Sequence, residues 1–214
     1  MTFKLPNYIP VEYARAPADY SWSEWDPYDE FGDSDPATEA TLSGLSDRAI
    51  SAYCIGCSEW VVARLQAFHE DARPFSYLEA LWVFETTDDR IWLPEELDQE
   101  EWQGKVLGAM GLSLMTVLNS VYGVEDDTSA SDGALAELLP MHVLPNQDAF
   151  LSWRCDVLKR LAVLYPRKGK AWGDPVPREV LDPGIPLAQI DAQVAIQRFL
   201  ATVDLQNNPY IRLV

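Results

Sequence analysis

The sequence predicts a mainly α-helical fold with a single domain. Its 214 residues suit one domain, and a hydrophobic content of 48% is too high for a disordered chain. Apolar residues recur at spacings of three and four in several stretches, which is typical of amphipathic helices. The longest uncharged run, residues 106–124, predicts an apolar helix at the centre of the fold. We therefore expect about five or six helices around a central helix at about residues 100–122, with few or short strands.

The first 44 residues predict an extended arm rather than a helix. Five prolines interrupt this segment, and each removes a backbone donor and biases the preceding residue toward extended geometry. The segment is nevertheless rich in Tyr and Trp, which a disordered linker does not usually carry. We expect residues 1–44 to form an extended aromatic-acidic arm packed on a helical domain of residues 45–214.

Helix signals follow one another from residue 45 onward. Ser46 is a good N-cap for a first helix that ends near residue 71, and a second helix spans 74–87. The central helix should end at Gly123, a residue suited to the position after a helix C-terminus. Each glycine inside this helix costs about 1 kcal/mol relative to alanine. We therefore expect Gly104, Gly108 and Gly111 to let another helix pack closely.

Four further predictions complete the chain. A short helix at 134–139 is stopped by Pro140, and a longer helix at 147–165 follows the N-cap Asn146. Residues 166–186 carry five prolines and predict a long loop. A last helix is expected at 187–204.

The overall charge excludes two classes of partner. A net charge of −18 disfavours nucleic acid, whose binding needs cations, and it disfavours anionic membranes. The N-terminus lacks the apolar segment of a signal peptide, and three cysteines favour a reducing cytoplasm over a disulfide framework. Residues 106–124 are just long enough to span a bilayer, but their polar side chains favour a buried helix of a soluble, cytoplasmic protein.

The charge is concentrated in the first part of the chain. Residues 1–150 hold 28 acidic and 7 basic residues, a net of −21, whereas residues 151–214 hold 6 and 9, a net of +3. Within the first part, acids gather at 19–39, 85–101 and 125–127. Two interpretations remain open: these acids are solvated or paired with the basic stretch 154–170, or they attract a basic partner.

Cys54 and Cys57 form the one motif with established chemistry. In redox proteins such a pair opens a helix, where the helix dipole lowers the thiol pKa, but here it lies inside a predicted helix. A zinc site needs four ligands, and Cys155, His69 and His142 are not paired at ligand spacing. We therefore expect buried apolar thiols, no metal, no cofactor and no catalytic residue.

The strongest candidate site interleaves aromatic residues with carboxylates in the arm. Aromatic anchors supply much of the energy of protein interfaces, and carboxylates pair with Arg or Lys across them. In the alternative, the rings only pin the arm to its own domain while the acids face water. The predicted partner-binding residues come from the arm and the second acidic segment: Trp22, Glu24, Trp25, Asp26, Tyr28, Asp29, Glu30, Asp88, Asp89, Glu95, Glu96 and Asp98.

These features predict a non-enzymatic acidic protein that neutralises a basic protein partner. In size and charge the chain resembles bacterial immunity proteins, a resemblance of general character that includes no motif. It implies a cognate toxin as the partner, inhibited by occlusion of its active or substrate-binding cleft. Two alternatives stay open: a structural or adaptor protein of an assembly, and a metal-dependent enzyme that uses Cys54 and Cys57.

Overall fold

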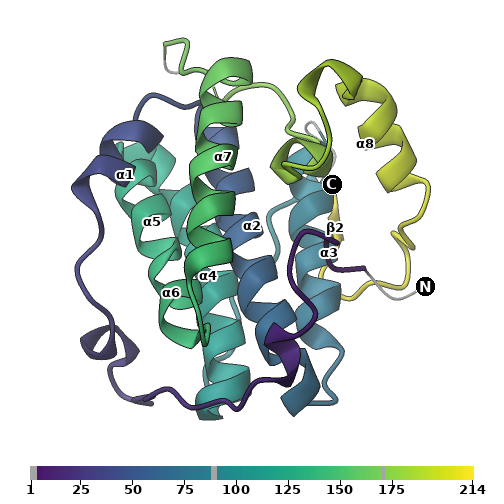
Figure 1. Ribbon diagram of the computed structural model, residues 1–214. Helices are drawn as coiled ribbons and strands as arrows, with labels where there is room; N and C mark the ends of the chain where they lie inside the picture. The colour runs from purple at the N-terminus through teal and green to yellow at the C-terminus, as the bar shows by residue number, and fades with distance from the viewer. Residues whose placement is uncertain (1–3, 88–90, 170–171) are drawn as a thin grey trace.

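The chain folds around helix α2 (Asp47–Leu65) in a computed structural model that describes residues 4–87, 91–169 and 172–214. The other α-helices in these ranges are α1 (Pro36–Leu42), α3 (Arg73–Thr86), α4 (Gly104–Asp126), α5 (Ser129–Ala136), α6 (Leu138–Val143), α7 (Asp148–Leu164) and α8 (Ala192–Leu200). Every residue of α2 is buried, because α3 to α7 all pack against it. Its N-cap is Ser46, as predicted, and the Ser46 hydroxyl accepts a hydrogen bond from the Ala49 amide at 3.3 Å. The mainly α-helical fold class is confirmed (Figure 1).

Helix α4 is the predicted central apolar helix, and it shares that central position with α2. It packs against α2, α3 and α5, and its inner face is buried. Among the described helices it alone is long and apolar enough to cross a membrane, and most of it is buried inside the protein, as in a core helix. Its outer face is only partly covered, with Leu112 and Met115 half-buried and Asn119 and Tyr122 exposed.

Two short strands join distant parts of the chain. Strand β1 (Ile91–Trp92) pairs antiparallel with β2 (Arg212–Leu213), and Ile91 lies opposite Leu213. The pairing ties the C-terminal segment to the stretch between α3 and α4. The prediction of few or short strands holds for the residues that the structure describes.

The N-terminal arm follows one end of the bundle. Residues 4–35 contain only short 3-10 turns, and they run along the end of the bundle that lies lowest in Figure 1 before reaching α1. The Tyr8 ring stacks on Trp153 of α7, with ring centroids 5.9 Å apart. At the end of α2, the buried Arg64 guanidinium donates to the carbonyl oxygens of Tyr13 at 3.0 Å and Pro17 at 2.5 Å. The arm is therefore fastened to the core by both ring packing and hydrogen bonds.

Several predicted helix ends differ from the structure. α4 continues through Gly123 to Asp126, and Asp127 supplies the left-handed residue at its end, with φ of 61°. A Cβ on Gly123 would lie 2.5 Å from Thr128 Oγ1, so this glycine permits close packing of the next turn rather than a helix end. The helix predicted at 187–204 is shorter, because Asp191 caps α8 through the Val194 amide at 3.1 Å.

Prolines explain other differences in the helices. α1 was not predicted, but Pro36 occupies its first position, where a missing N–H costs nothing. Pro140 lies in the first turn of α6 instead of ending a helix.

Two more helix ends differ from the prediction. The first predicted helix ends at Leu65 and continues only as a 3-10 turn, and α7 begins at Asp148, two residues after Asn146.

Candidate interaction site

A groove of about 500 Å³ lies on the outer face of α4, and we call it the α4 groove. Its floor is formed by the α4 residues Gly108, Gly111, Leu112, Met115 and Asn119. One wall is the arm, with residues Trp22 and Glu24 to Tyr28. The other wall is Leu97, Gln99 and Trp102. Two segments far apart in the sequence thus border one groove.

The arm wall is held against the start of α4 by polar contacts. The Tyr20 hydroxyl donates to the Lys105 carbonyl oxygen, and the Lys105 ammonium donates to the Ala18 carbonyl oxygen at 2.5 Å. The Glu24 carboxylate accepts from the Gly104 amide at 2.9 Å and from the Trp22 indole at 3.1 Å. Because Glu24 satisfies a free amide at the first residue of α4, it positions the wall and is not free for a partner.

Two glycines let the walls approach the floor. A Cβ on Gly108 would lie 2.9 Å from the Trp22 ring, and one on Gly111 would lie 3.0 Å from the Trp102 ring. The expectation that these glycines admit another helix is therefore wrong. They admit indole rings from the arm and from the segment before α4. At Gly104 the reason is conformational, since its φ of 81° is one that L side chains rarely adopt.

A second hollow of about 300 Å³ adjoins the α4 groove, and the two share Leu97 and Trp102. Its acidic residues are Glu95, Glu96, Asp98 and Glu101. Two of these acids have cations nearby. The Arg212 guanidinium lies 3.4 Å from the Glu95 carboxylate, and that of Arg73 lies 2.8 Å from Glu101. The carboxylates of both pairs are exposed, and such surface pairs contribute little to stability.

The structure brings most of the predicted partner-binding residues to these two hollows. Those in the α4 groove are Trp22, Glu24, Trp25, Asp26 and Tyr28, and those in the second hollow are Glu95, Glu96 and Asp98. Glu30 lies further along the arm and accepts a hydrogen bond from the Ser21 hydroxyl at 2.5 Å. Asp29 is exposed beside it. Asp88 and Asp89 lie outside the described residues.

The aromatic residues of the arm divide into two groups. Tyr20, Trp22 and Phe31 are partly buried against the core. Trp25 is 98% exposed, and Tyr28 is 40% exposed. The arm therefore uses some rings to attach itself and presents others to solvent, so attachment to the domain accounts for Tyr20, Trp22 and Phe31 but not for Trp25 and Tyr28.

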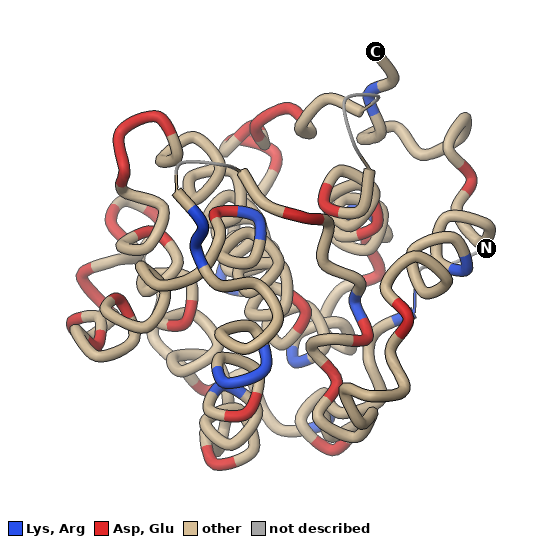
Figure 2. The backbone as a smooth tube through the Cα atoms, turned by 90° about the horizontal axis from the view of Figure 1, so that it is seen from above, with Lys and Arg blue, Asp and Glu red and all other residues tan. Residues whose placement is uncertain are grey.

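The basic residues are largely committed to interior or local partners. Arg178 contacts buried Glu59 at 2.6 Å, Arg154 contacts Glu137 at 3.1 Å, and Arg167 contacts both Asp47 and Asp127. Among the described residues, no ion pair found involves a carboxylate of residues 19–39. In Figure 2, Asp and Glu follow much of the outline of the molecule, while several Lys and Arg lie nearer its middle. The basic stretch 154–170 thus pairs with the buried carboxylates of Glu137 and Asp47 and with exposed Asp127, and with no carboxylate of the arm in the described ion pairs.

Sequence reasoning missed His142 and the floor residues. His142 Nε2 lies 2.7 Å from the Ser21 carbonyl oxygen, and its ring meets Tyr20 and Phe31 edge-on with centroids 5.5 and 4.9 Å away. It supports the underside of the arm. Among the floor residues, Gly108 and Gly111 were singled out only for close packing, and Asn119 could not be distinguished because Ser113, Thr116 and Ser120 are polar residues of the same run.

The cysteine pair lies in surroundings unsuited to thiolate chemistry. Cys54 and Cys57 are buried in α2, and burial raises the pKa of Cys54 to about 12 and that of Cys57 well above its usual value. Cys155 is exposed on α7. Within the described ranges, no group of three or more His, Cys, Asp or Glu side chains is arranged to hold a metal.

Comparison with known proteins adds no relative to this picture. No protein-family model matches the sequence, and neither a curated protein nor a solved structure shows significant similarity to it. The function is therefore argued from the two hollows and their charges.

Proposed function

We propose that this is a non-enzymatic acidic protein that binds a basic protein partner at the α4 groove and the second hollow. One observation carries the proposal: two acidic segments, distant in sequence, lie on either side of a single apolar helix face. Either segment alone is a solvated acidic stretch. Together they make a concave surface with an apolar floor and acidic edges, a composition that fits a basic partner with an apolar centre.

The charges support long-range attraction of such a partner. Asp26, Asp29, Glu96 and Asp98 are exposed, and none of them takes part in an ion pair found among the described residues. Exposed carboxylates of one sign raise the encounter rate with a cationic surface, and salt screens this effect over a Debye length of about 8–10 Å.

The exposed rings support short-range binding. Trp25 presents nearly its whole side chain to solvent, although indole rings contribute large apolar area. Trp and Tyr are enriched among the residues that dominate interface energies. Trp25 next to Asp26 also offers a ring face and a carboxylate to one Arg or Lys side chain.

The biological form of this proposal is an immunity protein that acts in the bacterial cytoplasm. Covering a toxin's basic active or substrate-binding cleft requires a surface that is acidic, concave and preformed. The α4 groove supports this because its walls are already attached to the domain by Tyr20, Lys105 and Glu24. No catalytic group is needed for inhibition by occlusion.

The first test reverses charge at the second hollow. The partner is captured from a native lysate, identified and purified, and its association with the wild type is measured by surface plasmon resonance at increasing ionic strength. The double variant Glu95→Lys, Glu96→Lys should slow association markedly, and the wild-type rate should fall as salt rises. The matched control is Glu70→Lys, Asp156→Lys, which makes the same charge change at exposed positions outside both acidic segments.

An association rate that is flat across ionic strength, or that falls equally in both double variants, would exclude this face as the partner site. The toxin hypothesis has a separate readout. Expression of the partner alone should arrest growth, and co-expression of the wild type, but not of Glu95→Lys, Glu96→Lys, should restore it. A partner that binds at this face but does not harm cells would retain the binding function and remove the immunity function.

A further inference from the structure

The floor of the α4 groove is a single helix face of regular spacing. Gly108, Leu112, Met115 and Asn119 follow one another at intervals of three and four, and Tyr122 extends the same line beyond the groove. At 1.5 Å per residue, the stripe from Gly108 to Tyr122 is roughly 21 Å long, or about four turns. The other faces of α4 pack on α2, α3 and α5. Gly108 is buried beneath the Trp22 ring, but from Leu112 to Tyr122 no other helix among the described residues covers the stripe, which leaves roughly 15 Å of it open to a partner.

We propose that the partner places an amphipathic α-helix in this groove, with its apolar face on the α4 stripe and Lys or Arg side chains toward both walls. The inference rests on the proposed function and specifies the element of the partner that is recognised. Helix-in-groove binding of this kind uses anchors spaced like those of the floor.

The backbone of the floor favours a helix over an extended segment. The amides and carbonyls of α4 are hydrogen-bonded within the helix, so the floor offers no ladder to an incoming strand. The first amide of α4, that of Gly104, already donates to Glu24, and the floor begins at Gly108, beyond the unpaired amides of the first turn. An extended peptide would leave its own backbone groups unpaired on an apolar surface, which is costly, whereas a helix satisfies them internally.

The charges around the stripe favour a basic helix. The described residues that line the groove include Glu24 and Asp26 and no Lys or Arg. Beyond Tyr122 the helix ends at exposed Glu125 and Asp126. Lys105, at the other end, is engaged with the Ala18 carbonyl oxygen. A helix lying along α4 therefore meets carboxylates at the end near Glu125 and Asp126 and along one side, where the second hollow adjoins, whereas at the other end Glu24 lies near the Lys105 ammonium.

The test uses two fluorescein-labelled peptides of identical Leu and Lys composition, each of about 18 residues. One places Leu at helical spacing, and the other alternates Leu and Lys as in a strand. Fluorescence anisotropy should show the helical peptide binding at least about tenfold tighter. Far-UV circular dichroism should show that it gains helix on binding.

Two variants locate the peptide. Asn119→Lys adds a cation at an exposed position in the middle of the stripe, so it should weaken the helical peptide about tenfold without unfolding the protein. Leu112→Lys should act in the same direction. Asp156→Lys, on the exposed face of α7 that runs in front of α2 and α4 in Figure 1, changes the net charge by one unit more and should have little effect.

Equal affinity for the two peptides overturns the helix proposal, and so does an Asn119→Lys variant that behaves like Asp156→Lys. Neither result removes the proposed function, which depends on the association of the natural partner with Glu95 and Glu96. Conversely, an association insensitive to those two residues removes the proposed function, while the Asn119→Lys comparison still reports whether a helix occupies the groove.

Discussion

Glu59 and Glu96 carry the same carboxylate in opposite surroundings. Glu59 lies in the middle of α2 with no exposed surface, and it accepts hydrogen bonds from Arg178 at 2.6 Å, Trp82 at 2.8 Å and Tyr8 at 3.1 Å. Glu96 lies at the edge of the second hollow, exposed to water. The Glu59 carboxylate is held by hydrogen-bond donors inside the protein, whereas the Glu96 carboxylate faces solvent.

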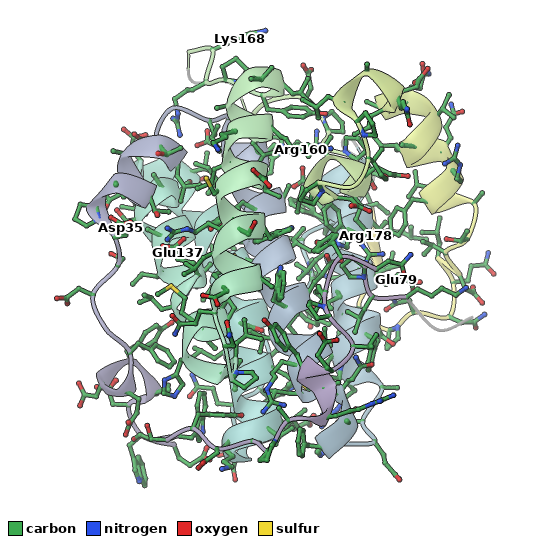
Figure 3. The ribbon with its side chains drawn as sticks, viewed as in Figure 1. Asp35, Glu79, Glu137, Arg160, Lys168 and Arg178 are labelled. Carbon is green, nitrogen blue, oxygen red and sulfur yellow. The ribbon has the colours of Figure 1, made fainter. Side chains whose placement is uncertain are left out.

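The contrast extends to three arginines that lie beside buried carboxylates. Each of the buried carboxylates Glu59, Glu85 and Glu137 lies beside an arginine, with Arg178, Arg48 and Arg154 respectively. Glu137 and Arg178 are labelled in Figure 3. Because a buried carboxylate is costly unless paired, these three guanidinium groups are committed to interior carboxylates, whereas Arg73 and Arg212 pair with Glu101 and Glu95 at the surface. The exposed carboxylates of the arm are then not neutralised by an ion pair found among the described residues, so the arm side of the α4 groove stays negatively charged.

The test with the largest expected effect removes the buried carboxylate of Glu59. Glu59→Ala should lower the free energy of unfolding by about 3–5 kcal/mol, because Arg178, Trp82 and Tyr8 all lose this acceptor inside the protein. Glu96→Ala, its matched control, should change it by less than about 0.5 kcal/mol. Urea denaturation measures both. Similar losses for the two variants would mean that the interior pair is no more important to folding than a solvated acid.

The next test compares a glycine of the core with a glycine of the groove. A Cβ on Gly56 would lie 2.6 Å from Leu181 and 2.8 Å from Trp153, both packed in the core. Gly56→Ala should therefore destabilise by about 1–3 kcal/mol. In Gly108→Ala the clash is with Trp22 of the arm, which can move, and the gain in helix propensity of about 1 kcal/mol offsets the strain.

Gly108→Ala should accordingly leave stability nearly unchanged in urea denaturation but weaken the helical peptide in the anisotropy assay, since Trp22 would shift within the wall. If Gly108→Ala destabilises as much as Gly56→Ala, the arm is as rigidly packed as the core. If it leaves peptide binding unaltered, the Trp22 wall takes no part in recognition.

Much of the fold was predictable because its signals are local. The N-cap Ser46, the apolar run of α4 and the proline-rich stretch at 166–186 each act within a few residues. The sequence signals failed where a distant segment decides the outcome. Gly108 and Gly111 were correctly singled out for close packing, but nothing near them in sequence indicates that the neighbours are Trp22 and Trp102. Similarly, complete burial of α2 depends on five other helices.

Prediction of the candidate site from the sequence was limited in the same way, by contacts between distant segments. Clustered acids and aromatic residues predicted the two segments, because composition is visible in the sequence. Their convergence on α4 was not, since it depends on contacts such as those from Tyr20 to Lys105 and from Glu24 to Gly104. For the same reason Glu24 was assigned to the partner, although its carboxylate accepts from the first amide of α4. Asp26, two residues away, remains exposed.

The last test is a dependence of stability on pH caused by the buried carboxylates. Burial raises the pKa of Glu85 well above its usual value of 4.5, and Arg48 only partly opposes this. Between the unfolded and folded pKa values the native state binds more protons than the unfolded state, so the free energy of unfolding falls as pH rises through that window. Lowering the pH from 7 toward 4.5 should therefore stabilise the protein, and Glu85→Gln should reduce the slope by up to about 1.4 kcal/mol per pH unit. Urea denaturation at a series of pH values measures both slopes. Because the exposed Glu96 does not undergo this burial, Glu96→Gln should retain the wild-type slope, and an equal change in both variants would show that net charge rather than burial controls the pH response.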